Sequence, residues 1–238
     1  MRVTIHQPEF MPWLGFFHKA SLADVLVLLD DGQFRKNYFH NRNRIRTPEG
    51  WRWVTIPIEK APLGTPITGI KIAGTNNPRW KEKIENGLRM SYSRSPFFED
   101  TVEGFSEILD GTTESLSDLN IALLEWMLPR FNLSPQILRA SDFDLQSSAS
   151  QRILDICLRT GATTYVSGIS GSDYLDLPAF KRAGIEVEIQ DFHHPIYDQL
   201  FPGFEPQISS IEALFLYGRD ANLLIQDQWP DKVDQVFR

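Results

Sequence analysis

The chain has 238 residues, with 24 lysines and arginines against 31 aspartates and glutamates, and therefore a formal net charge of −7. This acidic balance argues against a surface that binds duplex nucleic acid, although a local basic cluster can still bind a phosphate. A hydrophobic fraction of 42% is ample for a core, and the length predicts one large domain or one domain with an insertion. The sequence has neither an 18-residue apolar run nor a signal-peptide pattern, so we expect a soluble cytoplasmic protein without a membrane span.

Cysteine occurs once, at Cys157, which excludes an intramolecular disulfide and a cysteine-based zinc site. It shares an apolar helical stripe with Ile153 and Ile156, and this position is more typical of a packed thiol than of a nucleophile.

The first 30 residues predict a strand, a helix and a second strand. The β-branched run Val3–Ile5 is followed by Pro8 and Pro12, and an apolar-periodic stretch then predicts a helix from 13 to about 22. The apolar run Val25–Leu29 is too short for a helix and is typical of a strand buried on both faces. This order forms a βαβ unit, which predicts parallel strands.

The middle of the chain changes character twice. Residues 47–75 alternate apolar and polar positions between glycines and prolines, which predicts an antiparallel β insertion with strands near Trp51–Ile58 and Ile67–Ile72. Helical spacing then makes the region 78–132 mostly helical, in three stretches: 78 to about 92, 98–109 and 114–131.

The second half returns to alternating strands and helices. The expected elements are strands at Gln136–Arg139, Thr163–Ser167 and Ile185–Ile189, and helices at Ala149–Arg159 and Leu175–Ala183. Gly161 and Gly184 stand where left-handed residues end helices, and Ser209 with Glu212 resembles a capping box.

Together these elements predict an α/β fold, with a Rossmann-like parallel sheet of about five strands, a β insertion near 50–72 and a helical middle. We expect a single α/β domain over 1–225 and a polar tail over 226–238.

Polar side chains gather where the first two predicted strands end. Ligands of open parallel sheets bind at this edge, which His6 and Gln7 reach from the first strand and Asp30 from the second. Histidine titrates near neutrality and lysine is a compact cation, so the candidate catalytic residues are His6, His18 and Lys19. The alternatives are a core histidine bonded to backbone and a solvated lysine.

Asp30 and Asp31 raise the question of a cofactor. Adjacent carboxylates after a strand are able to hold Mg²⁺ together with phosphate oxygens. The alternative is a polar turn at Asp31-Gly32, and neighbouring strand residues point to opposite faces, so at most one carboxylate is expected to enter a site. Magnesium therefore stays an open candidate.

A basic segment follows the second strand and reads as an anion-binding segment, because guanidinium forks suit phosphates. Its candidate ligand-binding residues are Gln33, Lys36, Asn41, Arg42 and Arg44. Arg42 and Arg44 face the same side if the segment is extended. The alternative is a solvated basic face.

A glycine–serine loop lies between a predicted strand and a helix and is suited to an anion or to sugar hydroxyls. Its candidate residues are Ser167, Gly168, Ser170, Gly171 and Asp173, with Asp173 as a helix cap or ligand. The spacing matches neither a P-loop nor a nucleophile elbow, which argues against a serine hydrolase.

Three further residues follow the last predicted strand. Tyr197 is expected to stack on a ligand ring or to pack. His193 and His194 lack the spacing of a zinc-binding helix, so we expect no metal there.

Four blocks of sequence carry a family resemblance: HQPEFMPWLGFFHK, ADVLVLLDDGQFRKNYFHNRNRIR, YVSGISGSDYLD and ISSIEALFLYG. They occur in this order in the WbqC-like family of bacterial proteins, which the chain resembles from about Val3 to Gly218. Members resemble one another as products of gene clusters for surface polysaccharides such as O-antigen. The resemblance implies a transferase that acts on a nucleotide-linked amino sugar, by acyl or aminoacyl transfer to the amine. A non-catalytic nucleotide-sugar binding protein and a glycosyltransferase-like enzyme are the alternatives.

A weaker likeness links the chain to Rossmann-like nucleotidyltransferases and pantoate–β-alanine ligases, which also place a histidine-bearing loop after the first strand. The paired His-x-Gly-His of those enzymes is absent, and Trp13-Leu14-Gly15-Phe16 stands in its place.

Overall fold

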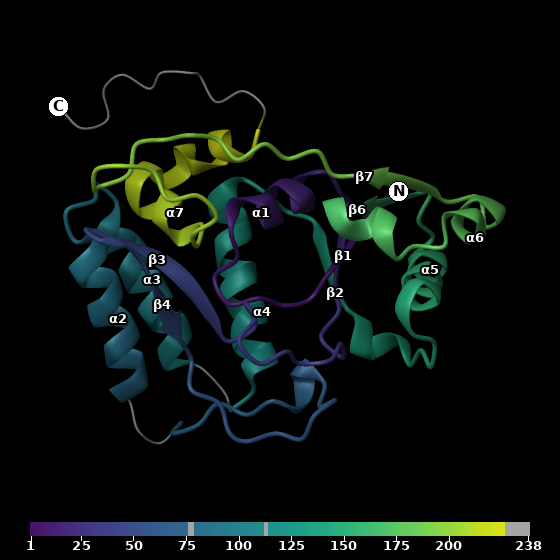
Figure 1. Cartoon of the computed structure of the whole chain (residues 1–238), viewed down its shortest axis with the longest axis horizontal. Helices are drawn as coiled ribbons and strands as arrows, with labels where there is room; N and C mark the ends of the chain where they lie inside the picture. Colours follow the sequence, from purple (N-terminus) through teal and green to yellow (C-terminus); the bar gives the residue numbers. More distant parts are fainter. Residues whose placement is uncertain (76–78, 112–113, 227–238) are drawn as a thin grey trace.

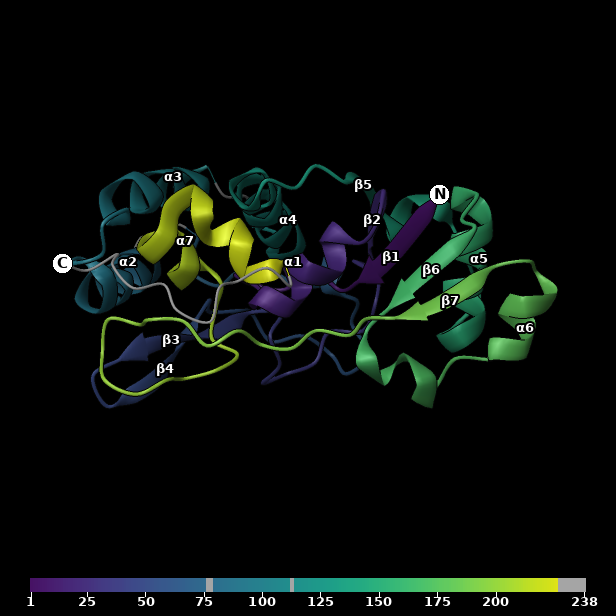
Figure 2. The ribbon, with the colours of Figure 1, turned by 90° about the horizontal axis from the view of Figure 1, so that it is seen from above.

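The computed structural model describes residues 1–75, 79–111 and 114–226 and contains a five-stranded parallel sheet. Its strands run in the order β5 (Gln136–Arg139), β2 (Val25–Leu28), β1 (Arg2–His6), β6 (Thr164–Ser167) and β7 (Glu186–Ile189) (Figure 2). The predicted α/β class with a Rossmann-like parallel sheet is therefore confirmed.

The chain reverses its direction of travel across the sheet between β1 and β6. From β1 it proceeds to β2 and β5 on one side, whereas β6 and β7 lie on the other. Thr4 pairs with Val166, and the Thr4 hydroxyl donates to the Val166 carbonyl at 2.8 Å. Open α/β sheets bind ligands beyond the carboxyl ends of their strands at such a switch point, which here lies just past His6 and Ser167.

Both faces of the sheet are covered, which explains the apolar run of β2. Val25 and Val27 pack in a core with α5 (Ala149–Thr160) and with Phe180 of α6 (Leu177–Arg182). Leu26 and Leu28 point to the opposite face, where the core includes α1 (Leu14–Ser21) and α4 (Leu116–Met127). A strand buried on both sides has no polar face to alternate with.

The predicted helical middle forms α2 (Arg79–Tyr92), α3 (Phe98–Asp110) and α4, and these helices gather with α7 (Ile211–Tyr217) at the end of the molecule opposite α5 and α6 (Figure 1). The stretch predicted to be helical to 131 changes at Leu128 into the 3-10 helix η2 (Leu128–Phe131), which contains Pro129. No helix in the described ranges is long and apolar enough to cross a bilayer.

The β insertion is smaller than predicted and begins earlier. It is an antiparallel hairpin of β3 (Arg42–Thr47) and β4 (Gly50–Thr55), so only the predicted strand near Trp51–Ile58 is confirmed. The strand predicted at Ile67–Ile72 is wrong, because the 3-10 helix η1 (Ile67–Gly69) occupies its first half. Within the described residues its second half forms isolated bridges, from Lys71 to Ser115 and from Ile72 to Ile58. Pro66 begins this turn, and the isoleucines are buried without a ladder.

The predicted helix-end signals have different outcomes. Gly161 and Gly184 have the expected positive φ of 70° and 73°. The capping box is wrong, because the Glu212 carboxylate accepts hydrogen bonds from Tyr197 and Gln199 instead of turning back to the start of α7. The predicted tail over 226–238 lies outside the described residues except for Gln226.

Candidate functional site

The candidate site begins where β1 ends and the chain turns toward α1. His6 is the last residue of β1, and Lys19 lies in the last turn of α1. The Lys19 ammonium is buried and donates to the Ile5 carbonyl at 3.0 Å, which ties the helix to the strand end. Two of the three predicted catalytic residues therefore meet beside the switch point of the sheet.

His6 is held in one tautomer. Its Nδ1 lies 3.0 Å from the Gln7 carbonyl oxygen, which only accepts, so Nδ1 carries the proton and Nε2 keeps a lone pair. Burial, with a further contribution from the charge of Lys19, lowers the pKa of His6 to about 3. His6 is therefore a neutral acceptor at physiological pH.

Glu9 is the unexpected member of this site. Its side chain is only 4% exposed, and within the described part of the chain its carboxylate has no hydrogen-bond partner. Burial raises the pKa of Glu9 to about 7, although the Lys19 charge opposes the rise. Burial likewise lowers the pKa of Lys19 to about 8 against the opposing charge of Glu9. The two groups thus titrate on either side of neutrality, where general acids and bases work best.

A loop that follows β2 closes the site from the other side. The Arg35 backbone N–H donates to His40 Nδ1 at 3.2 Å, so Nε2 carries the proton and donates to Gln7 Oε1 at 3.1 Å. Burial and the charge of Arg35 lower the pKa of His40 to about 4. Tyr38 is partly exposed, and burial together with the nearby charge of Glu9 raises its pKa.

We name this group the β1-end cluster; its members are His6, Gln7, Glu9, Lys19 and His40. Sequence reasoning identified His6, Gln7 and Lys19 but missed Glu9, His40 and their neighbours Arg35 and Tyr38. One signal was available, since Glu9 stands directly behind a strand that was expected to end at a ligand edge. Its burial depends on side chains that are distant in sequence, and no local pattern reports them.

The glycine–serine loop lies beside this cluster, at the end of β6. Ser167 is buried, and a Cβ at Gly171 would lie 1.9 Å from its Oγ, so only glycine fits there. Gly168 and Ser170 are more accessible. Gly168 directly precedes the 3-10 helix η4 (Ile169–Asp173), and Ser170 lies within it. Asp173 does not cap α6, because Asp176 accepts from the Ala179 N–H at 3.1 Å. The loop thus borders the switch point, and its ligand-binding role stays a prediction.

Asp30 and Asp31 are both engaged by protein groups. The Asp30 carboxylate is fully buried and accepts from the backbone N–H and the hydroxyl of Ser141, at 3.0 and 2.8 Å. Asp31 forms an ion pair with Arg152. Because Mg²⁺ takes carboxylates that are free to coordinate it, this pair does not fit a magnesium site.

Other candidate residues also serve internal contacts. The Asn41 amide donates to the Ile56 carbonyl at 2.9 Å, and the Tyr197 hydroxyl donates to Glu212 at 2.9 Å. His18 Nδ1 accepts from the Gln190 amide at 2.9 Å. The structure does not bring Asn41, Tyr197 or His18 into the β1-end cluster.

Tyr197 and Trp13 flank His194, whose ring stacks on each at a centroid distance of 6.2 Å. His193 is exposed beside Asp191. Neither histidine is part of a metal-binding group found among the described residues.

Arg42 and Arg44 lie in an extended strand on the same face of the hairpin, the geometry that the sequence suggested. Their guanidinium carbons lie 4.0 Å from the Trp53 ring centroid and 5.1 Å from that of Trp51, respectively. Arg42 also donates to the Asn37 carbonyl, and Arg44 donates to the Gln207 carbonyl at 2.7 Å. Lys36 and Gln33 are exposed on the loop before the hairpin.

Comparison with known proteins places the chain in a family. The model of the WbqC-like protein family matches residues 7–223. The chain is 31% identical over 223 residues to the Mycobacterium tuberculosis (strain ATCC 25618 / H37Rv) protein named Uncharacterized protein Rv1507c, covering 92% of this chain and 95% of that protein. No solved structure matches the chain. The match spans the β1-end cluster except His6, the hairpin and the loop after β6, and the chain belongs to the WbqC-like family.

Proposed function

We propose that the protein is a cytoplasmic transferase that passes an acyl or aminoacyl group to the amine of a nucleotide-linked amino sugar during bacterial surface-glycan assembly. The observation that carries this proposal is the Glu9 carboxylate, which is buried beside Lys19 without a hydrogen-bond partner among the described residues. An unpaired buried carboxylate destabilises a fold, and groups of this kind are concentrated at functional sites.

The chemistry follows from the charge states of the cluster. A sugar amine is protonated near neutrality, and Glu9, with a pKa of about 7, is suited to accept one of its protons. The freed lone pair attacks the carbonyl carbon of the donor, a C–N bond forms, and the bond to the donor's leaving group breaks with its electron pair. The second nitrogen proton neutralises that leaving group.

Lys19 and His6 would serve the same step in different ways. Among the described residues the Lys19 ammonium donates one N–H, to the Ile5 carbonyl, so another is able to stabilise the oxyanion that develops on the donor. The free Nε2 of His6 is an acceptor for a sugar hydroxyl. We assign His18 no proton transfer, because its Nδ1 is bonded to Gln190.

The diphosphate needs positive charge close to the cluster. Arg35 is exposed, and its guanidinium carbon lies 5.8 Å from the Tyr38 ring centroid. Its charge contributes to the lowered pKa of His40. Lys36 follows it, and Arg42 and Arg44 begin the hairpin. On this proposal the loop and hairpin hold the diphosphate, while the Ser167–Gly171 loop holds hydroxyls across the switch point.

The test is to incubate the protein with a panel of nucleotide amino sugars and acyl donors and to read product masses. Glu9→Gln should lower the rate of product formation about 100-fold or more, the usual contribution of a general base, while nucleotide-sugar affinity persists. Glu125→Gln is the matched control, because it makes the same change at an exposed position of α4 and should leave the rate unchanged.

Other outcomes separate the alternatives. Folded protein that binds a nucleotide sugar but yields no product across the panel would contradict the transferase and support a non-catalytic binding protein. Glycosyl transfer with a metal-held diphosphate is disfavoured by the engagement of Asp30 with Ser141 and of Asp31 with Arg152.

A further inference from the structure

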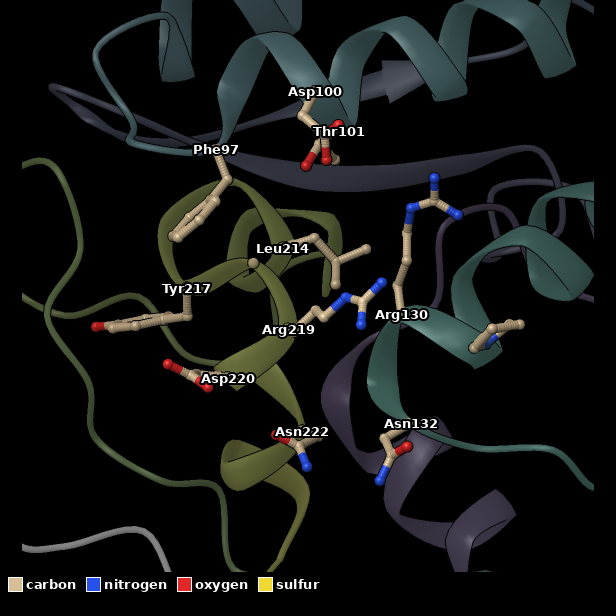
Figure 3. Close-up of a pocket in the computed structure, with 12 residues that line it drawn as sticks. Phe97, Asp100, Thr101, Arg130, Asn132, Leu214, Tyr217, Arg219, Asp220 and Asn222 are labelled. Atoms are coloured by element: carbon tan, nitrogen blue, oxygen red, sulfur yellow. The ribbon is translucent and has the colours of Figure 1, made fainter.

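A cavity of about 920 Å³ opens in the helical end of the molecule. Its walls come from α3, η2, α7 and the 3-10 helix η5 (Gly218–Ile225), none of which carries a residue of the β1-end cluster (Figure 3). Its size falls within the range of sites that bind small molecules.

Two guanidinium groups from different walls extend into this cavity. Arg130 comes from η2 and Arg219 from the start of η5 (Figure 3). The Arg130 guanidinium carbon lies 4.1 Å from the Trp126 ring centroid, and one nitrogen donates to the Trp126 carbonyl at 3.0 Å. Stacking and this bond fix the plane of Arg130 and leave its other N–H groups for a ligand.

Two carboxylates, those of Asp100 and Asp220, line the same cavity, but in the described part of the chain neither forms an ion pair with Arg130 or Arg219 (Figure 3). Within the described residues, Arg219 forms neither a hydrogen bond nor an ion pair. Burial lowers the pKa of Arg130; the carboxylate of Asp100 opposes this, and the charge of Arg219 adds to it. The two guanidiniums lie close enough to repel each other, and an anion placed between them would relieve that repulsion.

The backbone shapes the apolar wall of the same cavity. Gly218 has a φ of 55°, and a Cβ there would lie 2.9 Å from the Phe97 ring, so a glycine is required for this approach. Phe97 and Leu214 line the wall beside it, while Asn132 and Asn222 contribute amides (Figure 3). Apolar surface, amides, two carboxylates and two guanidiniums therefore line one cavity, whose Arg219 side is exposed.

We propose that this cavity binds a small phosphorylated molecule, with its phosphate between Arg130 and Arg219 and its carbon skeleton against Phe97 and Leu214. The amides of Asn132 and Asn222 are placed to bond the hydroxyls of such a ligand. This second site stands on residues apart from those of the proposed transfer reaction.

The experiment is calorimetric titration of the full chain with inorganic phosphate, pyrophosphate and glucose 1-phosphate. Arg219→Gln should weaken binding by about ten- to a hundredfold, as expected when a charge-assisted hydrogen bond is lost. Arg182→Gln removes the same charge from an exposed position of α6 and should bind like the parent. Asp100→Asn removes one of the two carboxylates that line the cavity and should tighten binding.

The proposal is overturned if the parent binds none of the three probes at millimolar concentration, or if folded Arg219→Gln binds like the parent. Circular dichroism checks the fold of each variant. If Arg219→Gln does not fold, Asp100→Asn decides the matter, because unchanged or weaker binding contradicts an anion site. These titrations need no turnover, so they are independent of the proposed transferase activity.

Discussion

Two groups of buried ionisable side chains lie in different parts of this molecule, and their carboxylates differ in how they are paired. In the Arg46–Glu212 network, made of Arg46, Tyr197, Gln199 and Glu212, the guanidinium donates to Gln199 and to several carbonyls, among them those of Thr47 and Gly50 at 2.6 and 2.7 Å. In the β1-end cluster, Glu9 has no hydrogen-bond partner among the described residues.

The difference indicates what each group does. Hydrogen bonds to Arg46 and to Glu212 Oε2 fix the loops that this network joins, although Glu212 Oε1 has no partner among the described residues. A buried carboxylate without a partner costs stability and is available to a substrate. Depth of burial alone does not separate the two, because Glu212 is as buried as Glu9 and has a pKa raised to about 8 by its burial.

The largest expected effect comes from breaking the network at its centre. Arg46→Leu leaves the carbonyls of Thr47, Gly50 and the 201–203 loop without their donor. We expect the free energy of unfolding to fall by about 3–5 kcal/mol, the range for removing one partner from a buried charged network. Urea unfolding followed by circular dichroism measures it, and a loss below about 1 kcal/mol would contradict the structural role.

The pH dependence of stability should separate the two glutamates. Each has a folded-state pKa raised from 4.5, to about 7 for Glu9 and about 8 for Glu212. The folded state therefore holds protons that the unfolded state releases, so stability is greatest below pH 4.5 for these groups and is lost as pH rises. Each group contributes a slope of at most about 1.4 kcal/mol per pH unit.

The glutamine variants locate these losses. Glu9→Gln should flatten the decline only up to about pH 7, whereas Glu212→Gln should flatten it up to about pH 8. Urea unfolding at half-unit steps from pH 5 to 9 gives the profiles, and identical profiles for parent and both variants would contradict the assignments.

A smaller effect is expected at the edge of the network. Tyr197→Phe removes the hydroxyl that donates to Glu212 at 2.9 Å and keeps the ring. We expect a loss of about 1–2 kcal/mol in unfolding free energy, as for a buried hydrogen bond, with unchanged affinity for nucleotide sugar. If the affinity falls and the stability does not, Tyr197 is a ligand residue after all.

The strands of the sheet were predictable because their apolar and β-branched residues, bounded by turn residues, are a local signal. Val25–Leu28 is buried on both faces, and no other element type fits such a run between turns. The same reasoning wrongly predicted a strand at Ile67–Ile72, because the isoleucines there are buried in and around the 3-10 helix η1. The strand β3 was not predicted, because its arginines at positions 42, 44 and 46 resemble a solvated basic segment. In the structure these side chains are covered by tryptophans and by a loop distant in sequence.

The candidate site divided along similar lines. The placement of His6 and Lys19 at the end of β1 was predictable because topology brings this strand end and its following helix to one edge of the sheet. Asp30 looked equally suitable, but Ser141 engages it from a distance of 111 residues along the chain. Glu9 was not selected as a candidate, because its lack of hydrogen-bond partners depends on the folded environment and not on its neighbours in sequence.

The claim that Glu9 is an unpaired carboxylate poised near neutrality is tested most directly by NMR titration of the protein with ¹³C-labelled glutamate carboxyl groups. We expect one resonance with a midpoint near pH 7 that disappears in Glu9→Gln and persists in Glu212→Gln. A Glu9 resonance that titrates near its ordinary value of 4.5 would contradict the account, because the carboxylate would then be solvated or paired.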